Sequence, residues 1–171
     1  DRSGSITLTF KVFSIEKGRR ESADCWMDSG QVKGMTTRII GTGSYVPEQI
    51  VTNNDLAQIV ETSDQWVRSR TGIGERRIAT VEGTSQMAAR AARRALEQAK
   101  VEPEAIDLIL LGTSTPDYCF PSGACEIQGM IGAVNAVCYD ISAACSGFVF
   151  ALNTAHAFIS SGIYKTALVI G

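Results

Sequence analysis

The sequence lacks the features that mark several large classes of protein. Its apolar runs fall far short of the roughly 20 residues that a membrane-spanning helix needs, so no transmembrane segment is predicted. The net charge is only −2, which argues against an extended electrostatic contact with nucleic acid. Apolar residues make up 44% of the 171 positions, too large a share for an intrinsically disordered chain. At about 150 residues per domain, one globular domain is expected.

Cysteine and histidine are also scarce. The five cysteines are odd in number and show no CxxC spacing, which fits neither a disulfide framework nor a zinc site. No secretory signal pattern is visible, so a reducing cytoplasm is the expected compartment. A single histidine, His156, restricts any Cys–His or Ser–His pair to this residue or to a group that the sequence does not contain. We predict no metal site and no bound cofactor.

Residues 1–34 differ in pattern from the rest of the chain. Beyond a short alternation from Ile6 to Val12 they show no sustained period, and they do not begin with Met, whereas a regular pattern opens at Met35. We therefore expect Met35 to be the true start and residues 1–34 to be an extension that is disordered or not native, such as an upstream read-through. A flexible natural arm is the alternative. Residues 35–171 should form the folded part.

Strand and helix patterns alternate after Met35. Apolar runs predict strands at 38–43, 106–111, 136–141 and 167–170. The run at 106–111, which only Asp107 interrupts, indicates a parallel strand buried on both faces, and 167–170 should be a further buried strand. Helices are predicted from Asn53 or Asn54 to 60, from a Thr62–Gln65 capping box to Gly72, from 84 or 85 to 99, from Pro121 to 130 and from Cys145 to 159. This order predicts an α/β fold with a mainly parallel sheet.

Two helices in this pattern raise further expectations. The helix at 145–159 is apolar almost all round, which is typical of a central, buried helix. It and the strand at 167–170 need covering layers, so we expect the chain to stop within a fold. The helix from 84 carries Arg90, Arg93 and Arg94 on one face. These side chains indicate either phosphate binding or, as we prefer, the solvated outer face of a packed helix.

The strongest chemical candidate is Cys145, in the segment AACSGF at 143–148. A thiol at the start of a helix meets unpaired N–H groups and the positive end of the helix dipole, and both favour the thiolate. The small neighbouring residues leave room for a substrate carbonyl, and the Cys145 N–H can donate to an oxyanion. On position alone, a structural cysteine that packs as a small hydrophobe is an equal alternative.

The other candidates for this chemistry are weaker. Cys119, Cys125 and Cys138 lack such surroundings and are interpreted as packing residues. His156 lies eleven residues after Cys145 on the same predicted helix, about 16 Å along its axis. We therefore reject His156 as the catalytic base.

These residues lie within a longer set of motifs that resembles a known family. Residues 35–171 resemble the N-terminal half of β-ketoacyl-acyl-carrier-protein synthase III, the initiating condensing enzyme of type II fatty acid synthesis. The motifs are IIGTGSYVPE at 39–48, TSDQW at 62–66, RTGI at 70–73, TSTPD at 113–117, FPS at 120–122 and DISAACSGF at 140–148. The resemblance implies a thiolase-like fold of two similar halves, each with a five-stranded sheet and buried helices.

The resemblance also implies roles for individual residues. Cys145 would be the nucleophile that takes an acyl group, usually acetyl, from coenzyme A before condensation with malonyl-acyl carrier protein. Trp66 and Arg70 match positions that hold the adenine end of coenzyme A, and Thr62 matches a third residue near the nucleotide. Phe120 matches the residue that reaches the partner subunit's acyl pocket in a homodimer. Acyl-CoA would be a substrate and not a cofactor.

The resemblance leaves part of the mechanism outside this sequence. The family's catalytic His and Asn, and a glycine that shares the oxyanion hole, lie in its second half. We therefore expect the 171 residues alone to be unable to condense. The alternatives are a related enzyme of secondary metabolism with another acyl-CoA or acceptor, and a non-catalytic half-domain that binds coenzyme A or pairs with another chain.

Overall fold

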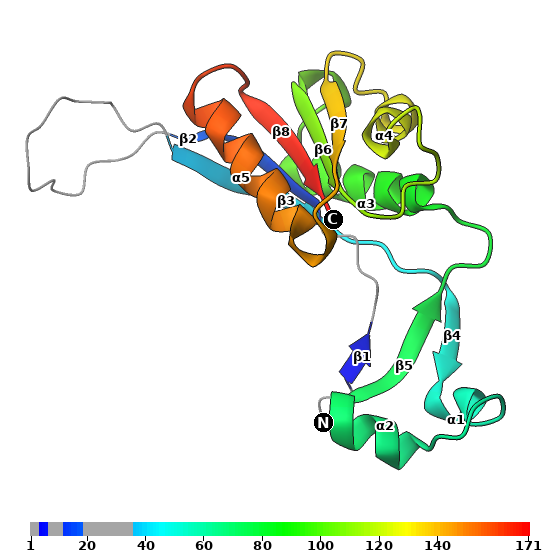
Figure 1. Ribbon diagram of the computed structural model, residues 1–171. Coiled ribbons are helices and arrows are strands. Elements are labelled where there is room, and N and C mark those ends of the chain that lie inside the picture. Colours follow the sequence, from blue (N-terminus) through cyan, green and yellow to red (C-terminus); the bar gives the residue numbers. More distant parts are fainter. Residues whose placement is uncertain (1–3, 7–11, 19–35) are drawn as a thin grey trace, which may run out of the picture.

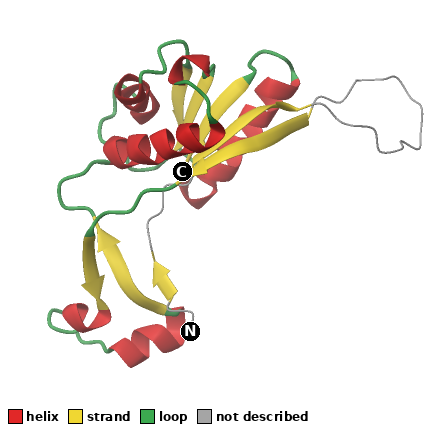
Figure 2. Cartoon of the chain, turned by 180° about the vertical axis from the view of Figure 1, so that it is seen from behind, coloured by secondary structure: helices red, strands yellow, loops and turns green. Residues whose placement is uncertain are grey.

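The main body of the protein is a five-stranded sheet covered by helices on both faces (Figures 1 and 2). The computed structural model describes residues 4–6, 12–18 and 36–171. The sheet order is β3 (Thr36–Gly43), β2 (Val12–Gly18), β8 (Thr166–Ile170), β6 (Leu108–Gly112) and β7 (Val137–Ile141). β6 runs parallel to both β7 and β8, whereas β2 is antiparallel to β3 and β8. The predicted α/β fold is therefore confirmed, and its parallel pairing joins β8, β6 and β7, whereas both antiparallel pairings involve β2.

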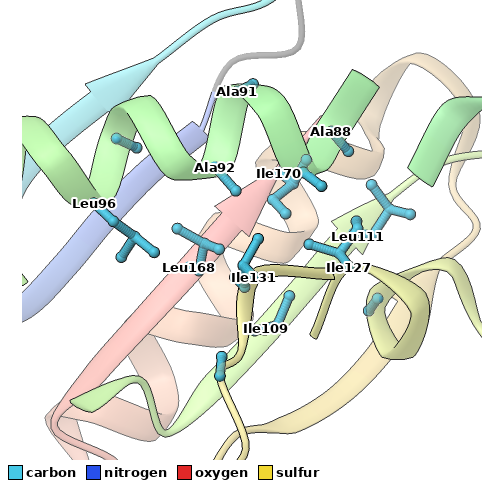
Figure 3. Packing of buried hydrophobic residues seen from close by; sticks show 14 of the residues in the cluster. Ala88, Ala91, Ala92, Leu96, Ile109, Leu111, Ile127, Ile131, Leu168 and Ile170 are labelled. Carbon is cyan, nitrogen blue, oxygen red and sulfur yellow. The ribbon is translucent and has the colours of Figure 1, made fainter. Parts of the chain in front are cut away.

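The side chains of the central strands alternate between two hydrophobic cores. On one face, Ile109 and Ile170 pack with α3 (Thr84–Ala99) and α4 (Gly123–Ile131), as Figure 3 shows. On the other face, Leu108 and Leu110 pack against α5 (Gly147–Ser160). All the core residues of β6 are completely buried, as predicted for a strand covered on both sides. Each such side chain contributes on the order of 1.5–3 kcal/mol through the hydrophobic effect.

A smaller lobe lies beside this body in both views (Figures 1 and 2). It contains the sheet β1–β5–β4 and two helices: β1 (Gly4–Ile6), β4 (Gln49–Thr52), α1 (Asn53–Leu56), α2 (Asp64–Thr71) and β5 (Ile73–Ile78). The buried Asn53 side chain holds the lobe together. It donates to Asp64 Oδ1 at 2.8 Å and to the Ile73 carbonyl at 2.7 Å, and it accepts from Arg76 at 2.8 Å.

Three helix starts differ from the sequence prediction because the capping residue is a neighbour of the one expected. α2 is capped by Ser63, whose Oγ accepts from Trp66 N at 3.1 Å, and not by Thr62. α1 is capped by Thr52 in a reciprocal capping box with Asp55. Ser122 caps α4, so Pro121 lies outside that helix. α2 does end at Gly72, which adopts the left-handed conformation as predicted.

The helix at 145–159 is less buried than its composition predicts. It begins at Gly147, and its buried residues are Gly147, Ala151, Ala155 and Ile159. Val149 and Phe150 are about half exposed, at 53% and 52%. Only one face of α5 therefore packs on the sheet within the described residues.

The three arginines of α3 are exposed, as expected for the outer face of a packed helix, but each guanidinium also binds protein atoms. Arg90 donates to the Tyr45 hydroxyl and Arg94 to the Ser44 carbonyl, while Arg93 donates to Met130 O on α4. The Tyr45 hydroxyl donates in turn to Glu82, and this hydrogen bond raises the pKa of Tyr45 and lowers the pKa of Glu82. The arginines thus tie α3 to its neighbours.

Strand β2 comes from the segment that the sequence analysis assigned to an extension. Residues 12–18 pair with β3 and residues 12–16 with β8, so β2 occupies an interior position in the sheet. The remainder of residues 1–34, except Gly4–Ile6, lies outside the described residues. No helix of the described ranges is long and apolar enough to cross a membrane.

Deleting residues 1–34 should strongly destabilise the chain, because it leaves β3 and β8 without the strand that joins them. We expect loss of a cooperative thermal transition, measured by circular dichroism. The single change Ile15→Pro, which removes one ladder hydrogen bond, should lower the melting temperature by a smaller amount. An unchanged transition in the deletion variant would show that β2 is dispensable.

Gly41→Ala should destabilise the protein by about 1–3 kcal/mol, because β3 packs directly against the backbone of α3. A methyl group at Gly41 would lie 2.5 Å from the Ala95 carbonyl oxygen. Gly129→Ala is the matched control: it lies inside α4 with open space around it, and should stabilise by about 0.5–1 kcal/mol. Chemical denaturation measures both, and equal effects would contradict the packing argument.

Candidate functional site

The candidate site lies where the parallel strands β6 and β7 end. Both strands point their carboxyl ends to the same edge of the sheet, where ligands bind in many α/β proteins. The segment 113–122 follows β6, and the segment 142–146 follows β7. The TSTPD, FPS and SAACS motifs therefore meet at one edge, although they are far apart in the sequence.

Cys145 lies in a tight turn between β7 and α5. Residues Ala144–Ser146 form a single 3₁₀ turn, closed by a hydrogen bond from Ser146 N to Ala143 O at 3.0 Å. Ala144 has φ of 45°, a left-handed conformation that costs an L-residue energy and that clusters at functional sites. Cys145 is exposed and forms no disulfide. The turn therefore presents its thiol to solvent, which disfavours the alternative of a buried structural cysteine.

A close contact between two glycines fixes this turn against the sheet. A methyl group on Gly112, at the end of β6, would lie 2.6 Å from the carbonyl carbon of Gly147 and 2.7 Å from Phe148 N. Gly147 is the first residue of α5 and is buried. Backbone thus packs directly on backbone, and the start of α5 is held at the end of β6.

The loop after β6 is anchored by Asp117. Its carboxylate accepts hydrogen bonds from Thr84 N at 2.7 Å and Ser85 N at 2.8 Å, at the start of α3. Burial raises the pKa of Asp117, but the two backbone N–H donors outweigh it, so the pKa lies below its usual value. Beyond this anchor the loop is open to solvent, and the Phe120 side chain is 90% exposed.

The remaining cysteines and the histidine have different surroundings. Cys138 is partly buried against Cys125, and burial together with that neighbouring thiol raises the pKa of Cys138 to about 12. Cys125 and Cys138 therefore fit their interpretation as packing residues. Cys119 contradicts that interpretation, because its loop leaves the core and the residue is exposed. His156 Nδ1 lies 2.8 Å from Thr37 Oγ1 on β3. The described residues contain no group of three His, Cys, Asp or Glu that could hold a metal.

The other candidates lie in the small lobe. The Arg70 guanidinium stacks over the Trp66 ring, with its carbon 4.5 Å from the ring centroid, so the predicted pairing on one helix face is present. Trp66 is 52% exposed, and its ring is available to a flat ligand. Thr62 is half-buried, just before the α2 cap. The structure does not bring this group next to Cys145, since α2 and the start of α5 lie apart in both views (Figures 1 and 2).

The sequence analysis missed the residues that shape this edge. Ala144 gave no signal, because alanine is not a residue expected at positive φ. Asp117 and Asp140 each accept from the first N–H groups of a helix that lies 16 or more residues away in the sequence. A carboxylate that caps a helix from such a distance leaves no local pattern.

Comparison with known proteins identifies several relatives of this chain. Residues 139–171 match a family model described as 3-oxoacyl-[acyl-carrier-protein] synthase III. The chain is 60% identical over 136 residues to a β-ketoacyl-[acyl-carrier-protein] synthase III of Clostridium acetobutylicum, covering 80% of this chain and 42% of the relative. A protein of the same name from Xylella fastidiosa is 56% identical over 140 residues, which cover 81% and 43% of the two chains.

Solved structures give the same result. A crystal structure of 3-oxoacyl-[acyl-carrier-protein] synthase III from Aquifex aeolicus matches with a TM-score of 0.73 and 52% identity, covering 75% of this chain and 42% of that one. A priming β-ketosynthase of a polyketide pathway matches with a TM-score of 0.71 and 40% identity, covering 73% and 38%. The fold is therefore thiolase-like, as the resemblance implied, and the chain spans less than half the length of these relatives. Over about four fifths of its length, the chain is therefore similar to β-ketoacyl-acyl-carrier-protein synthases III.

Proposed function

We propose that the protein is the initiating condensing enzyme of fatty acid synthesis and that Cys145 is its acyl-accepting nucleophile. The observation that carries this proposal is the exposed thiol in the strained turn at the ends of β6 and β7. The names of the relatives support the reaction class, and the SAACS motif lies within the residues that match the family model.

The first half-reaction uses the thiol and the backbone N–H of this turn, together with the oxyanion-hole glycine that the resemblance places in the second half of the family. The Cys145 thiolate attacks the carbonyl carbon of acetyl-CoA, and a negative charge develops on the carbonyl oxygen. The Cys145 N–H donates a hydrogen bond to that oxygen, and such a donor is typically worth several kcal/mol in the transition state. When the oxyanion collapses, the C–S bond to coenzyme A breaks, and its thiolate leaves and takes up a proton. The acetyl group stays on Cys145 as a thioester.

The second half-reaction joins this acetyl group to malonyl-acyl carrier protein. Loss of CO2 from the malonyl group leaves a carbanion that attacks the Cys145 thioester, releases the Cys145 thiolate and forms 3-oxoacyl-acyl carrier protein. The family resemblance assigns the decarboxylation to a His and an Asn outside these 171 residues. We therefore expect this stretch of chain alone to be unable to condense.

Coenzyme A binds, in this proposal, with its adenine end at the small lobe. Trp66 and Arg70 offer an exposed indole and a stacked guanidinium, both suited to a flat base, and Thr62 lies just before their helix. The separation of this pair from Cys145 fits the ligand, because the adenine and the thioester of an acyl-CoA lie at opposite ends of a long molecule.

The exposed Phe120 supports a homodimer in which each subunit completes its partner's acyl pocket. A phenylalanine that is 90% exposed in the single chain loses that exposure when a second copy covers it. We also propose a cytoplasmic location, without a membrane or nucleic acid partner, from the composition.

A second candidate function is a synthase of secondary metabolism with a different acyl-CoA or acceptor. The 40% identity to a priming β-ketosynthase of a polyketide pathway favours it as the alternative. Product analysis with a panel of acyl-CoA substrates separates the two. A non-catalytic half-domain would bind coenzyme A equally well without Cys145.

Cys145→Ala should abolish transfer of the acetyl group from acetyl-CoA to the protein, because no other thiol lies in this turn. Intact-mass spectrometry after incubation with acetyl-CoA measures the adduct, and peptide mapping locates it. Cys119→Ala is the control, since it removes another exposed thiol. Retained acetylation in Cys145→Ala, or its loss in Cys119→Ala, would refute the assignment.

Trp66→Ala should raise the KM for acetyl-CoA about tenfold with little change in kcat, because stacking on an adenine contributes equally before and during the chemistry. Arg70→Ala should raise it about threefold. Arg68→Ala is the matched control: it removes the same charge from α2, but its side chain is bound to Asp64 at 2.9 Å. If Arg68→Ala has the same effect as Arg70→Ala, net charge and not stacking explains the result.

A further inference from the structure

Two short segments connect the small lobe to the main body within the described residues. Residues 44–48 run from β3 to β4, and residues 79–83 run from β5 to α3, and neither segment contains a helix or a strand (Figure 1). The helices and strands of the lobe contact one another, whereas few contacts join them to the described helices and strands of the main body. The orientation of the lobe therefore depends on the contacts that hold these two segments.

A buried tyrosine joins the two segments to each other and to α3. The Tyr45 hydroxyl donates to Glu82 Oε1 at 2.7 Å, and it accepts from Arg90, which also forms an ion pair with Glu82 at 3.3 Å. The guanidinium carbons of Arg90 and Arg94 lie over the Tyr45 ring, 4.8 and 5.8 Å from its centroid. Arg94 donates in addition to the Ser44 carbonyl at 2.6 Å. We call Tyr45, Glu82, Arg90 and Arg94 the Tyr45 cluster.

Contacts on either side of this cluster hold the ends of the two segments. On the lobe side, Arg77 of β5 donates to the Pro47 carbonyl at 3.4 Å and to the Glu48 carbonyl at 3.2 Å. On the body side, a methyl group on Gly83 would lie 2.7 Å from both carboxylate oxygens of Asp117, which anchors the loop after β6. The path from β5 to the edge of the sheet at which the candidate site lies is therefore fixed by successive contacts.

The Tyr45 cluster places charged groups where little water reaches them. The Glu82 side chain is only 13% exposed, and the ring of Tyr45 is buried beneath the two guanidinium groups. Hydrogen bonds with a charged partner are stronger than neutral ones and depend on direction. They hold both segments in one geometry, which the nonspecific burial of apolar side chains does not do.

We propose that the Tyr45 cluster positions the small lobe, so that a coenzyme A whose adenine lies on Trp66 presents its thioester to Cys145. This inference rests on the proposed acyl transfer and on the proposed nucleotide site. Tyr45 touches no reacting atom and is a positioning residue. A lobe that is already held in one orientation loses less conformational entropy when one ligand occupies both ends of the site. Loss of the cluster therefore reduces the benefit of the nucleotide and leaves the chemistry at Cys145 unchanged.

Tyr45→Phe in the full-length protein tests this role, because it removes the hydroxyl and keeps the ring. The assay compares the second-order rate constants for acylation of Cys145 by acetyl-CoA and by acetyl-pantetheine, which carries the same thioester without the nucleotide. Acetyl-CoA should be the better donor for the wild-type protein. Tyr45→Phe should lower this advantage about fivefold, while the rate constant with acetyl-pantetheine stays within about twofold of the wild-type value.

A cycle of two substitutions measures the same coupling independently. Trp66→Ala should lower the rate constant with acetyl-CoA about tenfold in the wild-type background but only about twofold in the Tyr45→Phe background, because the indole is then no longer held in place. If the two factors are equal, Tyr45 and the nucleotide site act independently and the inference is wrong.

Tyr164→Phe is the matched control. It removes a hydroxyl from a partly buried tyrosine that packs on Phe158, just before β8 and at the opposite end of the sheet from residue 44. This variant should leave the advantage of acetyl-CoA unchanged, and a loss as large as that in Tyr45→Phe would overturn the inference.

The remaining outcomes separate the inference from the proposals beneath it. Equal losses with both donors in Tyr45→Phe, or an unchanged advantage of acetyl-CoA, overturn the positioning role alone. A wild-type protein that uses both donors equally well on Cys145 refutes the nucleotide site at Trp66, and the inference with it. If neither donor acylates Cys145 in the wild-type protein, the proposed function itself is wrong.

Discussion

The contact between Gly112 and Gly147 is the constraint on which the candidate site depends. Two residues without side chains allow the end of β6 and the start of α5 to approach at backbone distance. Because α5 begins there, the chain leaving β7 must turn within a few residues, and Ala144 adopts its left-handed conformation in that turn. Cys145 then projects from the rim of the sheet and not into either core. The exposure of the thiol is thus a consequence of close packing beneath it.

The core and the edge of the sheet are stabilised by different interactions. The strands are fixed by side chains that alternate between two cores and are completely buried, a non-directional hydrophobic contribution. The loops at the edge bury little, and their positions depend on carboxylates at helix starts. Charge-assisted hydrogen bonds are directional, so they hold a loop in one geometry without covering it. Candidate chemistry and exposed residues therefore coexist at an edge whose loops are anchored by hydrogen bonds.

The sequence predicted the helices and strands that contain runs of buried apolar residues, and it missed strands that lack such runs. β6, β8 and α3 follow from unbroken or periodic hydrophobic residues. β4 and β5 were missed because Gln49–Thr52 is short and Ile73–Ile78 carries three charged residues in its middle. Cys145 was found because its small neighbours and its place between a strand and a helix are local signals. Asp140 was not, because its partners Gly123 and Ala124 are brought to it only by the parallel pairing of β6 and β7 and the packing of α4.

The proposed function separates recognition of the ligand from its chemistry. Trp66 and Arg70 stack on each other in a lobe with its own sheet, organised by the buried Asn53. Cys145 lies in the turn that follows β7 of the other sheet, and different contacts hold it. Binding energy gained at a remote nucleotide is equal in the ground and transition states unless the protein couples the two ends of the ligand. Within the described residues, the two chain segments 44–48 and 79–83 connect the lobe to the main body, so the geometry of these short connections sets how far nucleotide binding can influence the thioester.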